Sequence, residues 1–357
     1  MAIWGDFQDV LDELITSERQ AEFAPIVVEK LYDRLRRDDY GIVIDGVRNG
    51  DLSASLVVND TYNAIPFVAG DSCDIGDCEI SPEYTAKQWE IVMAECRYTL
   101  CTREASRKFM ALWGQYKAIR PDDSEYDFVV EQMSDILSDI LVNSLIAKLF
   151  LSDKAYTEDT INGINGFISQ WKLEADNVLD VSAMVADTEA ITGEEWYNVM
   201  IAMMEAYEAD STIRRSRKEA QFIIDETGAR KIINMLNGAD RNSIYDCACL
   251  DAEGMVRAGR YSIEGLQVAG IPVRTIPYSD MIAQFDELNT LGVPVDPLFA
   301  VLTPKTEVQI GTPAMDELEM EDSFYDRKDR TYYFDIGYQF GAMIPSRNFI
   351  LADATEE

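Results

Sequence analysis

The chain has 357 residues, 47% of them hydrophobic, so it is long and apolar enough to fold around a large core. It carries 65 Asp and Glu against 31 Lys and Arg, a formal charge of -34, which disfavours a broad grip on nucleic-acid phosphates. It has no histidine, so the commonest general base and the commonest metal ligand are missing. We therefore expect no enzyme, with no catalytic residue, no cofactor and no metal.

The first 40 residues are predicted to form a helical arm. Apolar side chains repeat at three- and four-residue spacing in two sets: Phe7, Val10, Leu11 and Leu14, then Ile26, Val27, Leu31 and Leu35. Pro25 is expected to open the second helix, because proline is well suited to a first helical position. The N-terminus lacks the regions of a signal peptide, and no run approaches the roughly 18 apolar residues of a membrane span. We expect the protein to stay in the cytosol of its host cell.

Short β-type runs follow from residue 41 to about 81, broken by Asn-Gly and Gly-Asp turns. Such turns predict an extended hairpin region. Residues 88–101 then alternate with a change of phase, which is typical of a strand with a bulge near Met93.

The cysteines leave three interpretations open. Six of them lie at positions 73, 78, 96, 101, 247 and 249, and neither Cys73 with Cys78 nor Cys96 with Cys101 has the two-residue gap of a typical zinc knuckle. These four residues are interpreted as reduced structural thiols, as the ligands of a four-thiolate zinc site, or as disulfides formed after cell lysis.

The strongest helix pattern follows Pro121. Ser124 and Asp127 form a capping box, and apolar residues keep helical spacing from there to Leu151. The pattern predicts a helix of about 27 residues, roughly 40 Å long. Asp135 and Asp139 are expected on its solvated side. Such a helix is typical of a structural spine.

Alternating helices and strands are predicted between about residues 182 and 312, after INGINGFISQ, which we expect to be a glycine-punctuated loop. Thr192 and Glu195 form a second capping box. Further along, AQFIIDE is predicted to be a strand, TGARKIINMLNG a helix closed by Gly238, YSIEGLQVAGIPVRTIP a pair of strands and SDMIAQFDELN a capped helix. This region is interpreted as a mixed α/β lobe.

The run TYYFDIGYQFGA predicts a long, half-buried strand. Every even position from Tyr332 to Phe340 is aromatic or isoleucine, while Asp335, Gly337 and Gln339 hold the other face. Val308 and Ile310 predict a shorter strand before it. The large apolar face needs the spine helix or another sheet to cover it.

A basic cluster stands out in this acidic chain, at Arg214, Arg215, Arg217 and Lys218. We interpret it as an exposed helix end paired with nearby carboxylates, as a contact between subunits, or as a nucleic-acid contact. No phosphate-binding loop, dinucleotide fingerprint, nucleophile elbow or EF-hand spacing is present in the sequence.

This order of elements resembles the major capsid proteins of tailed double-stranded DNA bacteriophages, which share the Hong Kong 97-type fold. The segments that carry the resemblance are GINGFISQ, GLQVAGIPVRTIPYSDM and AVLTPKTEVQIGTPAMDELEMEDSFYDRKDRTYYFDIGYQFGAMIPSRNFILA. The resemblance implies an α+β fold with these parts: an N-terminal arm (1–40), an E-loop (41–88), a peripheral domain (89–181) with a spine helix at about 124–151, an axial domain (182–312), and a return to the peripheral domain (313–357) with a long strand at about 331–342.

The resemblance also implies a function. Such subunits self-assemble into hexamers and pentamers of an icosahedral shell that encloses double-stranded DNA without sequence-specific contact. The expected location is a virion capsid assembled in the host bacterial cytoplasm, away from any membrane, and the expected partners are scaffolding, portal and accessory capsid proteins. Neither an internal scaffold removed by proteolysis nor an isopeptide cross-link through Lys87 is expected. Two alternatives stay open: an encapsulin-like protein compartment with the same fold, and a carboxylate-based hydrolase.

Overall fold

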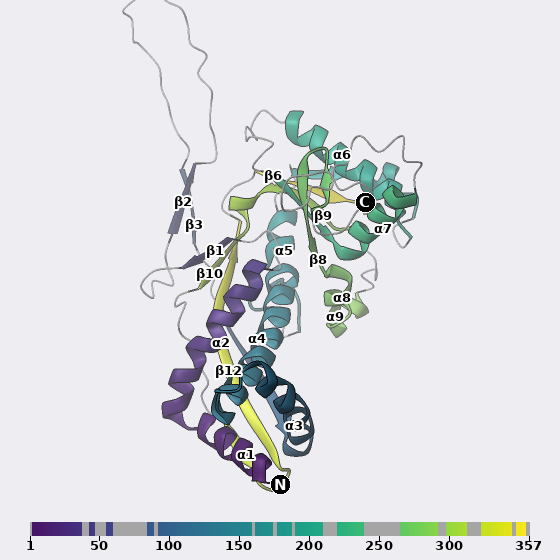
Figure 1. Ribbon diagram of the computed structural model, residues 1–357. Helices are drawn as coiled ribbons and strands as arrows, with labels where there is room; N and C mark the ends of the chain where they lie inside the picture. Colours follow the sequence, from purple (N-terminus) through teal and green to yellow (C-terminus); the bar gives the residue numbers. More distant parts are fainter. Residues whose placement is uncertain are drawn as a thin grey trace, which may run out of the picture.

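The computed structural model describes residues 2–37, 43–46, 55–59, 84–88, 92–158, 161–173, 177–187, 190–209, 220–238, 265–291, 298–312, 323–344 and 348–354. They form a long molecule of mixed helices and strands (Figure 1). The described helices are α1 (Ala2–Leu14), α2 (Ser17–Arg37), α3 (Thr102–Ile119), α4 (Glu125–Leu151), α5 (Phe167–Lys172), α6 (Gly193–Ala209), α7 (Glu226–Gly238), α8 (Tyr278–Ile282) and α9 (Asp286–Thr290). Short 3₁₀ turns lie at Ser182–Met184 and Lys305–Glu307.

The described strands make two larger sheets and one separate ribbon. The strands are β1 (Val43–Gly46), β2 (Ser55–Asn59), β3 (Tyr84–Gln88), β4 (Val92–Cys101), β5 (Val178–Asp180), β6 (Ala220–Asp225), β7 (Gln267–Val268), β8 (Ile271–Ile276), β9 (Ala300–Pro304), β10 (Gln309–Thr312), β11 (Phe324–Asp326), β12 (Thr331–Met343) and β13 (Ile350–Asp353). The first sheet has the order β1-β10-β12-β11 with β4 also on β12, the second has the order β5-β13-β9-β6-β8-β7, and β2 pairs with β3.

The longest ladder joins β4 to β12 in antiparallel pairing. Its register runs without interruption from Val92 opposite Phe340 to Cys101 opposite Thr331. The predicted bulge near Met93 is therefore wrong, because a bulge would place two residues of β4 opposite one residue of β12. The partner strand, 238 residues further along the chain, sets a regular register that the change of phase in the sequence did not indicate.

The predicted spine helix is confirmed as α4. The Ser124 Oγ accepts a hydrogen bond from the Asp127 N–H at 3.2 Å, and the Asp127 carboxylate accepts one from the Ser124 N–H at 2.8 Å. These two bonds satisfy backbone donors that a helix start otherwise leaves without partners. Side chains from Phe128 to Leu151 then fill the core along the helix.

Helices α1 and α2 pack against α4 of their own chain, as Figure 1 shows. Helix α2 begins at Ser17, so Pro25 lies inside it and does not open it, contrary to expectation. The expected solvated position of Asp135 and Asp139 on α4 is confirmed, since their side chains are 42% and 56% exposed. The Lys30 ammonium lies 2.7 Å from the Asp135 carboxylate, and Arg34 pairs with Asp139. These ion pairs come from α2, which is remote from α4 in sequence.

The predicted alternation of β12 is confirmed. Its even-numbered side chains point into the core and are nearly fully buried, from Tyr332 at 0% exposed to Phe340 at 1%. The cover that this apolar face requires comes from α1, α2 and α4. The chain then continues into β13, an inner strand of the second sheet. Residues 331–353 thus contribute to both sheets.

The second lobe follows the predicted order with two corrections. The Thr192–Glu195 capping box is present, and β7 and β8 form the predicted hairpin, turned by Ala269 and Gly270 at positive φ. However, Phe167 opens helix α5 inside the segment predicted to be a loop. The predicted single helix at SDMIAQFDELN is two short helices, α8 and α9, and no side chain caps the first of them.

Candidate assembly surfaces

The basic cluster Arg214, Arg215, Arg217 and Lys218 lies outside the described residues, so its predicted role as a contact between subunits stays a prediction. The same holds for Cys73 and Cys78, whereas Cys101 is a free thiol at the end of β4. Within the ranges given above, no group of three or more Cys, Asp or Glu side chains is placed to hold a metal ion. None of the helices described is long and apolar enough to cross a membrane.

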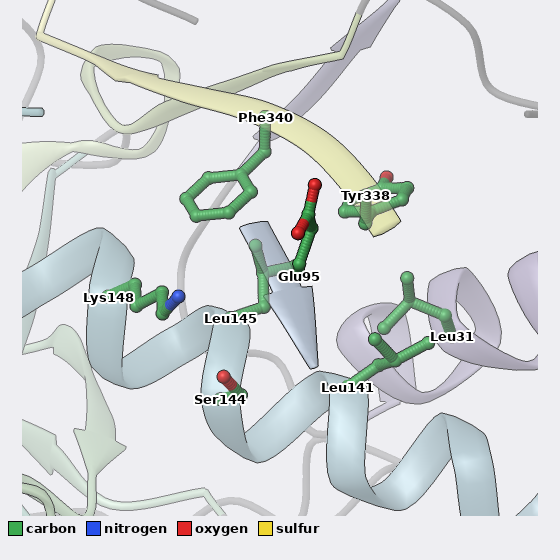
Figure 2. Close-up of a pocket in the computed structure, with 8 residues that line it drawn as sticks. All are labelled: Leu31, Glu95, Leu141, Ser144, Leu145, Lys148, Tyr338 and Phe340. Carbon is green, nitrogen blue, oxygen red and sulfur yellow. The ribbon is translucent and has the colours of Figure 1, made fainter. Parts of the chain in front are cut away.

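A small cavity lies between α2, α4 and the first sheet (Figure 2). Its lining is mostly apolar, with Glu95 of β4 and Lys148 of α4 as charged members beside Leu145 and Phe340. The cavity holds about 20 Å³, whereas ligand pockets usually hold roughly 300–1,000 Å³. A space of this size admits about one water molecule. The cavity therefore has the dimensions of a packing gap beside the spine helix.

Hydrogen bonds of tyrosine hydroxyl groups link helices α1 and α2 to β12. The Tyr332 hydroxyl donates a 2.6 Å hydrogen bond to the Asp12 carboxylate of α1. Burial, together with this carboxylate, raises the pKa of the Tyr332 phenol far above its ordinary value. Further along the strand, the Tyr338 hydroxyl lies 2.6 Å from the Tyr32 hydroxyl of α2. Both N-terminal helices are thereby positioned by specific polar contacts as well as by apolar packing.

The opposite face of the first sheet carries a compact group of polar and aromatic side chains. The Arg97 guanidinium donates two hydrogen bonds to the Asp335 carboxylate, at 2.5 and 2.6 Å. It lies within 6 Å of the ring centroids of Phe324 and Tyr333, which stack 4.9 Å apart. The Arg97 hydrogen bonds hold the pKa of Asp335 below its usual range. Phe324 stays 43% exposed, so this face presents an aromatic surface to solvent.

Helix α3 was missed by the sequence analysis. Ala105 and Phe109 are its only two buried side chains among 18 residues. The available signal was the four-residue spacing of Ala105, Phe109 and Trp113, which continues the aromatic cluster of Phe7 and Phe128. A helix bound along so narrow a seam leaves most of its surface exposed.

Helix α9 is joined to the loop after α4 by a carboxylate clamp. The Glu287 carboxylate accepts hydrogen bonds from the backbone N–H groups of Thr157 and Glu158, the shortest at 2.6 Å. The Glu158 carboxylate in turn accepts a 3.1 Å bond from the Glu287 N–H. The bond from the Thr157 N–H is the largest cause that lowers the pKa of Glu287. The carboxylates of Glu287 and Glu158 thus each accept hydrogen bonds from backbone N–H groups of the other segment.

Comparisons with known proteins give a fold and no family. No protein-family model matches the chain, and no curated protein matches it. Among solved structures, a chain of the satellite phage P4 procapsid, which includes a size determination (Sid) protein, is 12% identical with a TM-score of 0.50, and the match covers 92% of this chain and 99% of that one.

Two further solved structures match with lower scores. The capsid of a native GTA particle is 11% identical over 89% of this chain and 88% of its own, with a TM-score of 0.48. A virus-like particle from Pyrococcus furiosus is 10% identical over 91% of this chain and 96% of its own, with a TM-score of 0.41. We rest the fold assignment on the procapsid chain alone. The predicted resemblance to phage capsid proteins is thus confirmed as a likeness of fold, a mixed arrangement of helices and sheets.

Proposed function

We propose that this protein is the major capsid protein of a tailed double-stranded DNA bacteriophage and that it builds an icosahedral shell of hexamers and pentamers. The observation that carries the proposal is the match to the P4 procapsid chain, which extends over nearly the whole of both chains. Shell formation is the property that the proposal transfers from that structure to this chain.

The proposed parts follow the Hong Kong 97-type arrangement. Residues 1–40 form the N-terminal arm and residues 41–88 the E-loop. Residues 89–181 and 313–357 form the peripheral domain around α4 and β12, and residues 182–312 the axial domain. Because α1 and α2 pack on α4 of the same chain, most of the proposed arm is anchored on its own subunit.

Three features of the molecule support a load-bearing role. Helix α4 has 27 residues and a largely buried surface. Strand β12, with 13 residues, packs its apolar face toward that helix. The chain then enters the second sheet through β13, so the two lobes share one continuous segment. A subunit built in this way is suited to transmit force along its length.

The charge of the chain supports a DNA container. With a formal charge of -34, most of its surface repels phosphate, and packaged DNA slides along such a wall without sequence-specific contact. We place the protein in the virion capsid after assembly in the host bacterial cytoplasm. Scaffolding, portal and accessory capsid proteins are its proposed partners.

The test is negative-stain electron microscopy of the protein expressed alone and together with its neighbouring genes. We expect closed shells or rings, with double-stranded DNA in shells that have filled. Shells that hold protein cargo and no nucleic acid would point instead to an encapsulin-like compartment. Monomers under both conditions would overturn the shell proposal and return attention to a carboxylate-based hydrolase.

A further inference from the structure

The outer face of α3 is basic, although the chain as a whole carries a formal charge of -34. Residues 97–120 contain six Lys or Arg against the single acid Glu104. Three more exposed cations, Arg327, Lys328 and Arg330, lie in the turn before β12, together with the exposed acid Asp329. The Arg330 carbonyl accepts a 3.0 Å hydrogen bond from the Thr102 N–H, which places this turn at the start of α3. The two segments therefore form one basic surface.

The cations of this surface differ in whether they form an ion pair with the described residues. Arg120 pairs with Glu131 at 2.6 Å, and Arg97 pairs with Asp335. In contrast, Arg103, Arg107 and Lys108 are exposed and form no ion pair with any residue that the structure describes. Their charges are open to an external partner.

Apolar side chains lie on the same helix as these cations. Ile119 is 80% exposed, Met110 48% and Leu112 40%. A Cβ added at Gly114 would meet no atom within 4 Å, so the helix surface at this position faces open space. Phosphate groups offer nothing that would bury such apolar area, whereas a protein surface does. The mixture of cations and exposed apolar side chains therefore favours a protein partner over nucleic acid.

Helix α1 lies beside α3 and carries the opposite charge. The Phe7 ring of α1 packs against the Phe109 and Trp113 rings of α3, with centroids 6.1 and 5.6 Å apart. Helix α1 contains four acids and no Lys or Arg. Asp9 and Asp12 are exposed. Figure 1 shows both helices at the same end of the molecule. One end of the molecule thus presents a basic helix, α3, and an acidic helix, α1, next to each other.

We propose that two copies of this chain meet at this end, with α3 of each copy against α1 of the other. A twofold contact uses the same patch on both subunits, so each residue pair occurs twice. A patch with neighbouring surfaces of opposite charge is complementary to itself in such an arrangement, whereas α3 against α3 would bring cations together. The inference rests on the proposed shell function, because it assigns one contact by which copies of the subunit pair.

The test uses two reversed-charge variants of the full chain. R107E/K108E makes the α3 surface acidic, and D9K puts a cation on the α1 surface at an aspartate that has no ion pair among the described residues. Each variant alone places like charges against each other at both halves of the contact. We expect each to raise the protein concentration needed for pairing and assembly by about tenfold or more, since close charge pairs contribute at least one such factor.

Mixing the two variants is the decisive step. In a mixed pair, the Lys at position 9 of one copy faces the Glu residues of the other, and the unchanged halves also match. We expect the mixture to regain assembly at close to the wild-type concentration in sedimentation velocity and negative-stain images. Circular dichroism of the unassembled subunits checks that both variants fold. Defects that mixing does not restore would reveal a role within one chain and overturn the proposal.

The remaining outcomes separate this inference from the proposed function. Wild-type protein that stays monomeric at every concentration overturns both. Variants that assemble like the wild type and package as much DNA overturn the α3–α1 contact and leave shell formation intact. Shells of R107E/K108E that form normally but contain less DNA overturn it in favour of a nucleic-acid contact.

Discussion

The phenolic oxygens of Tyr32 and Tyr338 lie 2.6 Å apart in the buried layer between α2 and β12. The two residues are 306 positions apart in sequence, and their side chains are 7% and 3% exposed. A polar contact in an apolar layer restricts how the two elements can slide against each other. The pair therefore fixes the register of a helix near the start of the chain on a strand near its end.

We predict that Y32F and Y338F each lower the free energy of unfolding by about 1 kcal/mol, the usual worth of such a hydrogen bond. The double variant Y32F/Y338F should lose less than the sum, because both substitutions remove the same bond. Urea unfolding of unassembled subunits provides the three values. Strictly additive losses would mean that the two hydroxyls do not act as a pair.

The cap of α4 gives a second prediction. S124A removes the side chain that accepts from the Asp127 N–H, and we expect a loss of about 1 kcal/mol in the free energy of unfolding. S106A is the matched control. Its hydroxyl donates only to the Arg103 carbonyl inside α3, at 3.0 Å. Because alanine is the better helix former, the control should change stability by less than about 0.5 kcal/mol. Equal losses in both variants would contradict the capping role.

Two glycines in helices should respond in opposite ways to alanine. At Gly193, the first residue of α6, a Cβ would overlap the carbonyl oxygen of Lys231 and come within 3.0 Å of the Met235 Cβ. We expect G193A to cost about 1–3 kcal/mol of stability, the usual cost of overpacking. At Gly114 a Cβ meets nothing within 4 Å, so G114A should stabilise the protein by roughly 0.5–1 kcal/mol. Thermal unfolding of unassembled subunits compares the two. A neutral G193A would show that α6 and α7 can move apart freely.

Acid should release the clamp between α9 and the loop after α4. The pKa of Glu287 is lowered in the folded state, mainly by the hydrogen bond from the Thr157 N–H. A group with a lowered folded pKa contributes stability above its unfolded value, about 4.3 for glutamate, and loses it as the pH falls through the lower folded value. We predict that hydrogen exchange at residues 153–158 rises as the pH falls from about 4.5, after correction for intrinsic rates.

Two variants check that assignment. E287Q should give fast exchange at these residues already at pH 7, because an amide oxygen accepts less strongly than a carboxylate. E194Q, an exposed glutamate in the first turn of α6, is the control for the general effect of acid on so negative a chain. Protection that is unchanged in E287Q would remove Glu287 from this role.

Local patterns in the sequence were sufficient for the parts of the fold whose stability is mainly local. The spine helix, both capping boxes, the alternation of β12 and the β7–β8 hairpin each depend on residues within a few positions of one another. In contrast, the salt bridge of Asp135 with Lys30 and the regular register of β4 depend on partners about 100 or more residues away. Periodicity does not encode such pairings, so the ion pair was not predicted and the bulge predicted near Met93 was wrong.

The assembly surface was harder to predict for a different reason. Helix α3 buries only Ala105 and Phe109, so its amphipathic signal is weak, and its exposed cations alone resemble any solvated helix. Its significance depends on the acidic helix α1 beside it, and that neighbourhood exists only after folding. The cluster at Arg214, Arg215, Arg217 and Lys218 is visible in the sequence and stays a prediction.

The position of β12 and β13 near the end of the chain has a consequence for synthesis. Both sheets need residues 331–353 for an inner strand, so neither can close until the ribosome has made that segment. Until then α1 lacks the hydrogen bond between Tyr332 and Asp12, and α3 lacks the hydrogen bond between Thr102 and the turn at Arg330. A nascent chain therefore cannot present the two helices in their final arrangement. Only chains in which residues 331–353 have been synthesised are competent to pair through these two helices.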